Sequence, residues 1–469
     1  MSTDWVVAFS LVKLHHLSNS MSNHSILVLK ETSLPRQRRR QSRLFRFESM
    51  WLEDERCKNV VEEAWERGRT SHSQWPFEAC LEECQMSLRS WNTHTFGHMG
   101  KQVADLQRKF QMLENMKATS TDLEAIHATK MELNRWLGIE EKMWQQRSRN
   151  NWLKAGDKNI TFFHTKASNR YQRNTISRIM DANNKWLEDV DQIGQAFVGY
   201  FEELFSTSRP KVEQEMIDAV HSKVTERMNS TLIQGFHAME VEKALKQMHP
   251  LMAPGPNDMP PLFYHHFWPT IKSIVISTVL DFLNYDVSPP KFHDTHNVLI
   301  PKTKNPKKVT DYRPISLCNV AYKIASKVVA NKMKLVLREI IGENQSAFVV
   351  EHLIIDNVLV AHEMMSHINK KKKGKCGEMA IKLDMSKAYD WVEWECLKQV
   401  MKKLGFHEKW ISTVMRCVSS VKYTVRINGQ PYGFIQPVGV CVFQTLKVCL
   451  CPTLVRDEFT YMFINHNTT

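Results

Sequence analysis

The residue best placed to do chemistry in this chain is Asp384, which lies at the end of the short apolar segment 379–385. The pattern predicts a buried strand, then a helix that has Ser386 as its N-cap and stops at Gly405. A carboxylate at the end of a buried strand is costly unless a cation binds it, and Mg²⁺ takes such oxygen ligands readily. Asp384 is therefore a candidate magnesium ligand. The alternative is a structural aspartate that caps the helix or pairs with a neighbouring lysine.

A second group of candidate residues is basic. Residues 297–301 predict a short strand that runs into the lysine-rich loop 302–308, and residues 311–317 predict a second strand-like piece. Lys302 and Arg313 would then lie on facing strand ends, where their charges suit the phosphates of a triphosphate. The alternative is that both side chains are ordinary solvated surface charges.

The elements that must position these residues follow from the spacing of apolar side chains. Residues 46–149 contain few Gly or Pro and predict amphipathic helices arranged as a long helical hairpin. Asn428-Gly429 predicts the turn of a β-hairpin, because both residues tolerate a positive φ. Strands are predicted near the N-terminus, and a loop is predicted at 254–261 from its dense Pro and Gly. Further helices are predicted at 193–204, 262–285 and 320–341, the last with an apolar side and a basic side.

Charge and cysteine usage limit the class of protein. The net charge of +13 and the pI of about 9.2 favour a polyanionic partner, above all nucleic acid. Aromatic and basic residues interleaved at 162–173 could grip a nucleic-acid backbone, or form a basic helix face over an aromatic core. No cysteine pair has the spacing of a zinc site, and no apolar run is long enough for a membrane span. We expect an intracellular protein, in the nucleus or the cytoplasm, with no membrane partner.

The ordered motifs carry a family resemblance. The region 297–433 resembles the fingers and palm of reverse transcriptases from plant LINE-type (non-LTR) retrotransposons. The matching stretches are LIPKTKNP, DYRPISLCNVAYKIASKVVANKM, GENQSAFV, IIDNVLVAHE, IKLDMSKAYDWVEW and VRINGQPYGFIQP. Upstream, MAPGPNDMPPLFYHHFW and SRNNWLKAGDKNITFFHTKASNR look like the linker that such polyproteins carry before the polymerase. HLSNSMSNHSILVL looks like the end of their endonuclease.

The resemblance implies roles for individual residues. Asp384 matches the first catalytic carboxylate and Mg²⁺ ligand of the polymerase, and Tyr389 matches the aromatic gate under the sugar of the incoming nucleotide. Lys302 and Arg313 fall in the fingers motifs as candidate triphosphate contacts. His24 matches the catalytic histidine of the endonuclease, of which only a remnant would be present. The implied partners are an RNA template and a DNA primer or target.

The sequence also departs from the family pattern. Two-metal nucleotidyl transfer needs several carboxylates, and the family supplies the others from an aromatic-x-Asp-Asp hairpin that this sequence does not contain. The resemblance stops at Pro437, after which residues 438–447 look like the family's next stretch in a shifted reading frame. Asn23 stands where the endonuclease has the aspartate that orients His24. These departures predict a catalytically incomplete remnant.

The predicted architecture is α+β: a helical N-terminal half followed by a partial reverse-transcriptase right hand, with fingers and an incomplete palm. The predicted parts are an endonuclease remnant with a basic linker (1–47), a mainly helical region (48–235), partial fingers and palm (236–437) and an unrelated tail (438–469). The predicted function is that of a reverse-transcriptase domain protein, without polymerisation, that keeps some nucleic-acid binding. The alternative is a non-catalytic RNA- or DNA-binding protein or a helical interaction protein.

Overall fold

The computed structural model describes ten stretches of the chain. They are residues 12–17, 26–31, 45–97, 99–115, 120–148, 160–181, 183–206, 217–341, 353–370 and 393–437. The chain divides into two compact units, Met1–Phe45 and Arg46–Thr469, each of which is treated by itself. Asp384, Tyr389 and His24 lie outside the described residues, as does the predicted tail 438–469, so what the sequence predicts for them stays a prediction.

The described part of the first unit is a pair of antiparallel strands. Strand β1 (Val12–Leu17) pairs with β2 (Ile26–Glu31), and Leu14 lies opposite Leu29. The N-terminal strands expected from the sequence are therefore present, with β1 reaching Leu17.

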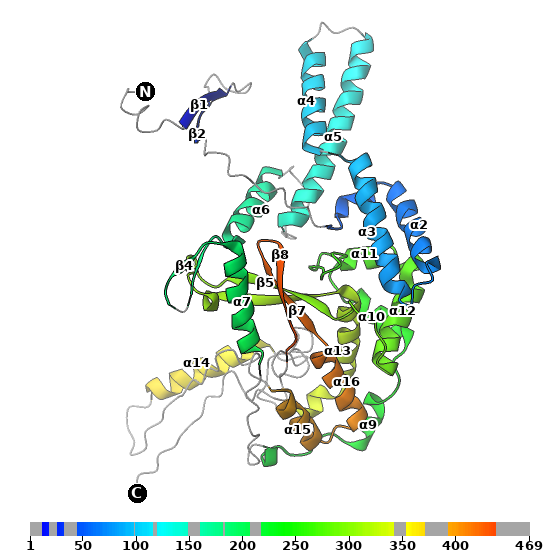
Figure 1. The fold of residues 1–469 in the computed structure, drawn as a ribbon, viewed down its shortest axis with the longest axis vertical. Coiled ribbons are helices and arrows are strands. Elements are labelled where there is room, and N and C mark those ends of the chain that lie inside the picture. The colour runs from blue at the N-terminus through cyan, green and yellow to red at the C-terminus, as the bar shows by residue number, and fades with distance from the viewer. Residues whose placement is uncertain are drawn as a thin grey trace. The chain divides into compact units, whose positions relative to one another are not determined.

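The second unit mixes helices and strands, in agreement with the predicted α+β class (Figure 1). Its helical elements are η1 (Ser49–Glu53), α2 (Arg56–Thr70), α3 (Pro76–Thr95), α4 (Met99–Asn115), α5 (Ser120–Ser148), α6 (Ile160–Asn174), α7 (Val190–Leu204), α9 (Glu226–Leu232), α10 (Ala238–Lys246), α11 (Pro261–His266), α12 (Trp268–Tyr285), η2 (Val309–Asp311), α13 (Val320–Ile340), α14 (Ile354–Lys370), α15 (Trp394–Leu404) and α16 (Glu408–Ser419). Its strands are β3 (Ile179–Met180), β4 (Trp186–Leu187), β5 (Asp294–Pro301), β6 (Tyr312–Cys318), β7 (Lys422–Ile427) and β8 (Gln430–Ile435).

A four-stranded sheet organises the second unit, in the order β6-β5-β7-β8. Strand β5 runs antiparallel to β6 and parallel to β7, so that Val298 lies between Ile315 and Arg426. Burial alternates along both β5 and β7, because successive side chains of a strand point to opposite faces. One face is buried, and the other, with Val298 and Arg426, stays partly open.

Helix α7 covers the strands on the buried side. The ring of Phe197 lies 5.3 Å from that of Tyr312, and the ring of Phe205 lies 5.5 Å from that of Tyr423. At Gly433, with a φ of 62°, a Cβ atom would lie 2.6 Å from Val198, so only glycine fits there. Glycine at position 433 therefore allows β8 to lie close to α7.

Helix α13 is buried on nearly all sides and packs against α10 and α12. Its predicted apolar positions are buried, but the predicted basic side is only partly exposed, which corrects the sequence interpretation. Lys323 donates from Nζ to the Ala253 carbonyl at 2.6 Å, and Lys332 donates to the Gln234 carbonyl at 2.5 Å. Backbone carbonyls of neighbouring loops thus accept hydrogen bonds from the two ammonium groups, which would otherwise be costly to bury.

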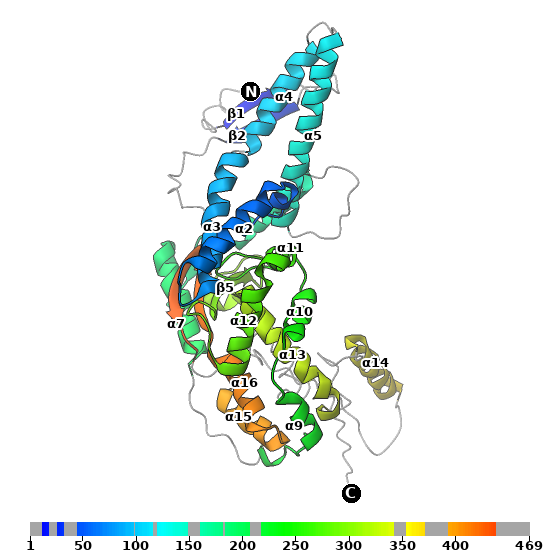
Figure 2. The same cartoon turned by 90° about the vertical axis from the view of Figure 1, so that its right-hand side faces the viewer.

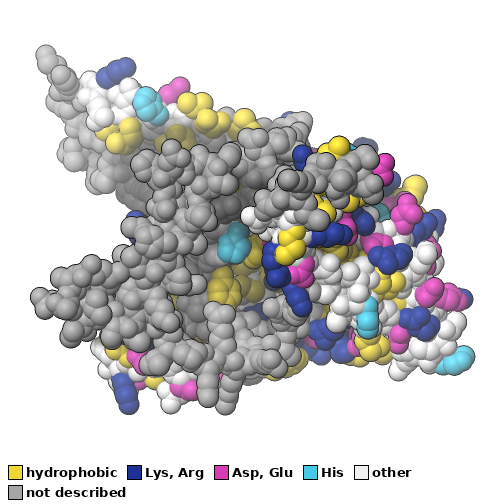
Figure 3. Space-filling view, turned by 90° about the horizontal axis from the view of Figure 1, so that it is seen from above, with side chains coloured by type: hydrophobic (Ala, Val, Ile, Leu, Met, Phe, Trp, Pro, Cys, Tyr) yellow, Lys and Arg dark blue, Asp and Glu magenta, His cyan; other side chains and the backbone are white. Residues whose placement is uncertain are grey.

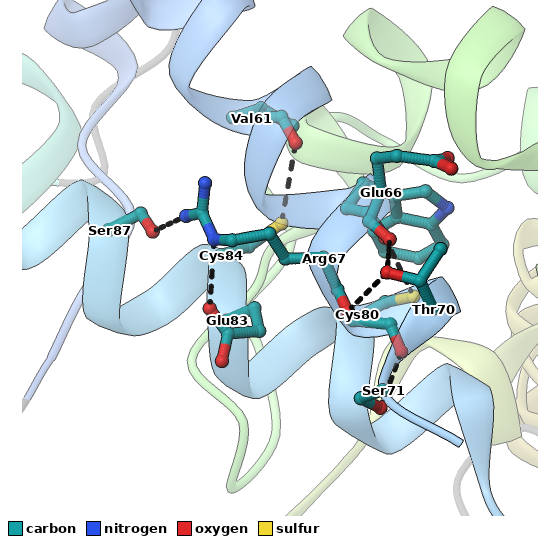
Figure 4. A network of polar contacts seen from close by, with 11 residues as sticks. Val61, Glu66, Arg67, Thr70, Ser71, Cys80, Glu83, Cys84 and Ser87 are labelled. Atoms are coloured by element: carbon teal, nitrogen blue, oxygen red, sulfur yellow. Dashed lines mark hydrogen bonds and ion pairs between the residues drawn. The ribbon is translucent and has the colours of Figure 1, made fainter. Parts of the chain in front are cut away.

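Helices α2 and α3 form a tight pair (Figure 4). Cys80 donates from Sγ to the Trp65 carbonyl at 3.2 Å, and burial raises the pKa of this thiol to about 12. At the rim of the interface, Arg67 donates to Glu83 at 3.4 Å and to Ser87 at 2.7 Å. Cys80 acts here as a small apolar residue with a weak hydrogen-bond donor. Its raised pKa makes the thiol a poor nucleophile.

The predicted helical hairpin is present as α4 and α5, which run side by side (Figure 2). The connector expected before residue 235 contains a helix as well, α9, which buries Met228 and Leu232. Helix α15 ends as predicted, with Gly405 in the left-handed region at a φ of 94°. It begins at Trp394, later than predicted, because Glu393 is extended and serves as the N-cap.

Candidate functional site

Lys302 and Arg313 lie next to each other at the end of the β5–β6 ladder. Arg313 pairs with Ile300 in register, and the N–H of Lys302 donates to the Asp311 carbonyl at 2.8 Å, which extends the ladder by one residue. Because side chains alternate between faces, Lys302 and Arg313 point to the same face as diagonal neighbours. Both side chains are exposed and lie where the strand ends meet, and their predicted role in binding a triphosphate stays a prediction.

The loop that follows Lys302 is held in a fixed conformation by its own residues. One carboxylate oxygen of Asp311 accepts from the N–H groups of Lys307 and Lys308 at 2.8 and 2.9 Å. These bonds keep the pKa of Asp311 below its ordinary value, with nearby lysines adding to the effect. Lys302 donates from Nζ to the Thr310 carbonyl at 2.8 Å, so its ammonium group is oriented while two of its donors remain for a ligand.

The same sheet face carries two further cations that sequence reasoning missed. Lys422 and Arg426 lie four residues apart on the same face of β7, opposite Asp294 and Val298 of β5. Among the described residues, neither side chain makes an ion pair with a carboxylate, nor do Lys302 and Arg313. The even spacing of Lys422 and Arg426 was visible in the sequence, but only the parallel pairing of β5 with β7 brings these cations beside the fingers residues.

Burial tunes the titratable groups on this face. Burial, together with the nearby Arg426, lowers the pKa of His296 to about 4, so the imidazole is neutral at pH 7. Burial raises the pKa of Asp294, an effect that Lys422 and Lys291 oppose. The face is therefore positive overall, which suits phosphate oxygens.

The predicted loop at 254–261 adds a carboxylate near the same cations. Asp258 adopts a positive φ of 51°, and its carbonyl accepts from the N–H of Phe47 at 3.4 Å. Burial raises the pKa of Asp258 to about 6, an effect that Arg426 and Arg46 oppose. Asp258 thus lies close enough to Arg426 for the two charges to interact.

Part of the chain is similar to a known protein family. Residues 300–445 match the family model described as reverse transcriptase (RNA-dependent DNA polymerase). Residues 300–445 are called the reverse-transcriptase segment after this match. It includes Lys302, Arg313, Lys422 and Arg426, so four cations of the open sheet face fall inside the matched region.

Two curated relatives point the same way. The chain is 23% identical over 422 residues to the transposon TX1 uncharacterized 149 kDa protein of Xenopus laevis, an alignment that covers 87% of this chain and 31% of that relative. It is 26% identical over 136 residues to the retrovirus-related Pol polyprotein from type-1 retrotransposable element R2 of Nasonia vitripennis, covering 29% of this chain and 13% of the relative. The chain thus spans less than a third of either relative. The first alignment extends well beyond the reverse-transcriptase segment, so the helices before it are also similar to a transposon protein.

The catalytic carboxylate predicted within the reverse-transcriptase segment, Asp384, lies outside the described residues with Tyr389. Within the described stretches, no three His, Cys, Asp or Glu side chains are grouped so that they could hold a metal ion. The magnesium site therefore rests on the sequence. No helix in the described part of the chain is both long and apolar enough to cross a membrane.

The basic and aromatic stretch at 162–173 lies on helix α6. Phe163 is buried, Tyr171 is 72% exposed, and Lys166 lies over the ring of Phe162 at 5.6 Å. The stretch therefore has one aromatic residue in the core and one in solvent, and both sequence interpretations of it remain open.

Proposed function

We propose that this chain is a reverse-transcriptase domain protein of a non-LTR retrotransposon, whose open sheet face binds nucleotide triphosphate and the nucleic-acid backbone. One observation carries the proposal: Lys302 and Arg313 are exposed, diagonal neighbours on one face of the reverse-transcriptase segment. An arginine fork binds phosphate through two parallel hydrogen bonds, while a lysine supplies a point charge. Lys422 and Arg426 extend the same positive face along β7.

Two residues outside the described stretches, Asp384 and Tyr389, enter this proposal on the basis of the sequence alone. Asp384 would supply a magnesium ligand, and Tyr389 would lie under the sugar of the incoming nucleotide. Nucleotidyl transfer with two ions needs several carboxylates, and these 469 residues contain no adjacent Asp-Asp pair. We therefore propose that these residues alone bind an RNA template, a DNA primer and nucleotide inside the cell without joining nucleotides.

Nucleotide binding tests the role of the two cations. A fluorescent dTTP analogue is titrated against the wild-type chain and against Arg313→Ala, Lys302→Ala and the matched control Lys272→Ala, which removes an exposed lysine of α12. Each site variant should weaken binding about 10- to 100-fold, because a hydrogen bond to a charged group contributes roughly 1.5–3 kcal/mol. Arg313→Lys should fall between, since it keeps the charge and loses the fork. Equal affinity for wild type and Arg313→Ala would refute the site.

Primer extension tests the second half of the proposal. The wild-type chain and Asp384→Ala are incubated with an RNA template, a DNA primer, magnesium and nucleotides. We expect nucleotide binding without extension in both. If the wild-type chain extends the primer and Asp384→Ala does not, other carboxylates of this chain complete a working site. The proposal that the catalytic site is incomplete would then be wrong.

A further inference from the structure

We propose that the hairpin β3–β4 and the adjoining lysine loop form a stacking platform for single-stranded nucleic acid, outside the nucleotide site. The hairpin lies outside the segment that matches the reverse-transcriptase family, which starts at residue 300. The partner class rests on the proposed function, but the surface does not. Of the lysine loop it uses only Lys304, Lys307 and Lys308, which lie inside the matched segment, and it uses neither Lys302 nor Arg313.

The hairpin and the loop are joined by backbone pairing at Met180. Met180 pairs with Trp186 across the hairpin, and its N–H donates to the Lys307 carbonyl at 2.7 Å. Met180 also forms a parallel bridge with Lys308. Trp186, Met180 and Lys308 therefore lie in one row, in which Lys308 is joined to the two-stranded hairpin by a single bridge.

This row of residues faces solvent. Residues directly opposite each other in a sheet point to the same face, and so does a residue two positions along. Arg178, Met180, Trp186 and Lys308 therefore share one face, while Ile179, which is fully buried, points into the core. Two strand spacings separate Trp186 from Lys308 by roughly 10 Å.

Trp186 is a partly exposed aromatic residue stacked with a cation. The residue is 36% exposed, and the guanidinium of Arg178 lies over its ring at 4.4 Å from the ring centre. An exposed ring beside a stacked arginine is the arrangement on which unpaired bases stack, irrespective of their sequence. A cation–π pair that only stabilises the hairpin would give the same geometry, so the test must separate the two roles.

The loop lysines beside the ring are available to a ligand. Within the described stretches, Arg178, Lys304, Lys307 and Lys308 make no ion pair, although the side chain of each is exposed. The carboxylate of Asp181 is occupied by the hairpin turn, where it accepts from the N–H groups of Asn183 and Lys185 at 2.9 and 2.8 Å. By contrast, basic and acidic side chains are interspersed on the face drawn in Figure 3. The platform can therefore bind a strand by its bases and its phosphates together.

The experiment measures the affinity of fluorescein-labelled dT12 and U12 by anisotropy at several salt concentrations. Trp186→Ala and Trp186→Leu should weaken binding roughly 5- to 150-fold, the value of one stacked base, without changing the salt slope. Trp186→Phe should keep most of the affinity because it keeps an aromatic face. Lys308→Ala should reduce the salt slope by about 0.7, the share of one phosphate in a single strand. Tyr285→Ala and Lys272→Ala are the controls, an exposed aromatic and an exposed lysine on α12, and should leave binding unchanged.

Three outcomes would overturn the platform. Wild-type affinity in Trp186→Leu would mean that the ring only fills space. A loss in Trp186→Phe as large as in Trp186→Leu would mean that an aromatic face is not what binds the strand. A duplex of the same length, titrated in the same way, would refute a single-strand partner if it bound as tightly as dT12. The dTTP titration keeps the two proposals apart: Trp186→Leu should leave nucleotide affinity unchanged, whereas Arg313→Ala should lower it. Comparison of dT12 with U12 shows whether the strand is DNA or RNA.

Discussion

The side-chain amide of Asn428 makes two hydrogen bonds to the backbone of Ile176, a residue 252 positions earlier. The Asn428 Oδ1 accepts from the Ile176 N–H at 2.8 Å, and the Asn428 Nδ2 donates to the Ile176 carbonyl at 2.8 Å. Asn428 is also the first residue of the β7–β8 turn, with a φ of 49°. One residue thus shapes the hairpin and fixes the segment between α6 and β3 against it.

Replacing Asn428 by glycine should separate these two roles. Glycine accepts the positive φ but removes both hydrogen bonds, leaving the Ile176 groups without their partner. We expect a loss of about 1–3 kcal/mol in the free energy of unfolding, measured by urea denaturation. Asn184→Gly is the matched control, because Asn184 has a φ of 60° in the β3–β4 turn, and should change stability by only a few tenths of a kcal/mol. Equal stabilities for the two variants would contradict the role of the side chain.

Acid should destabilise the fold through His293. Its ring is buried beside Phe282 and Tyr322, and its nitrogens lie 2.9 and 3.0 Å from the hydroxyls of Ser288 and Ser420. Burial lowers the pKa of His293 to about 4 from 6.5, and Lys422 adds to the effect. Since the unfolded chain binds the proton first, the stabilisation is fully present above pH 6.5 and is lost as the pH falls towards 4.

The expected size of this loss is roughly 3 kcal/mol, from about two to three pKa units at 1.36 kcal/mol each. Urea unfolding of the wild-type chain at pH 7, 6, 5 and 4.5 would measure it. His293→Asn should be less stable at pH 7 but should show a flatter dependence on pH in this range. An unchanged slope in the variant would exclude His293 as the titrating group.

The α2–α3 interface should tolerate no side chain at Gly68. A Cβ atom there would lie 2.4 Å from the Cα atom of Cys80, which is backbone and cannot rotate away. Gly68→Ala should therefore lower the free energy of unfolding by about 1–3 kcal/mol or more, although alanine favours a helix elsewhere. Gly100→Ala is the control, because no atom lies within 4 Å of the added Cβ, and thermal denaturation of the two variants should differ clearly in midpoint.

Local signals in the sequence predicted the elements well. Asn428-Gly429 specifies its turn through the backbone freedom of two adjacent residues, and Gly405 ends α15 for the same reason. The strands around Lys302 and Arg313 followed from short apolar runs bounded by Pro and Lys. Each of these features depends on a few neighbouring residues, which is why a pattern alone predicts it.

The remaining features depend on residues far apart in the chain. The spacing in α13 predicted its apolar side but not the carbonyls of Ala253 and Gln234, which bind Lys323 and Lys332 and bury them. Nothing near Trp186 in sequence indicates that its hairpin pairs with the chain at Lys308. The predicted carboxylate Asp384 was identified by resemblance, and the structure does not test it.

The parallel pairing of β5 with β7 has a consequence for biosynthesis. The ribosome finishes β5 at Pro301 but does not begin β7 until Lys422, and at roughly 5–20 residues per second the interval is on the order of ten seconds. During that time the backbone N–H and C=O groups along one edge of β5 have no partner strand, and they can bond to solvent or to another nascent chain. A polypeptide released before Lys422 is translated would therefore be prone to aggregation. In the completed chain, β7 pairs with that edge of β5.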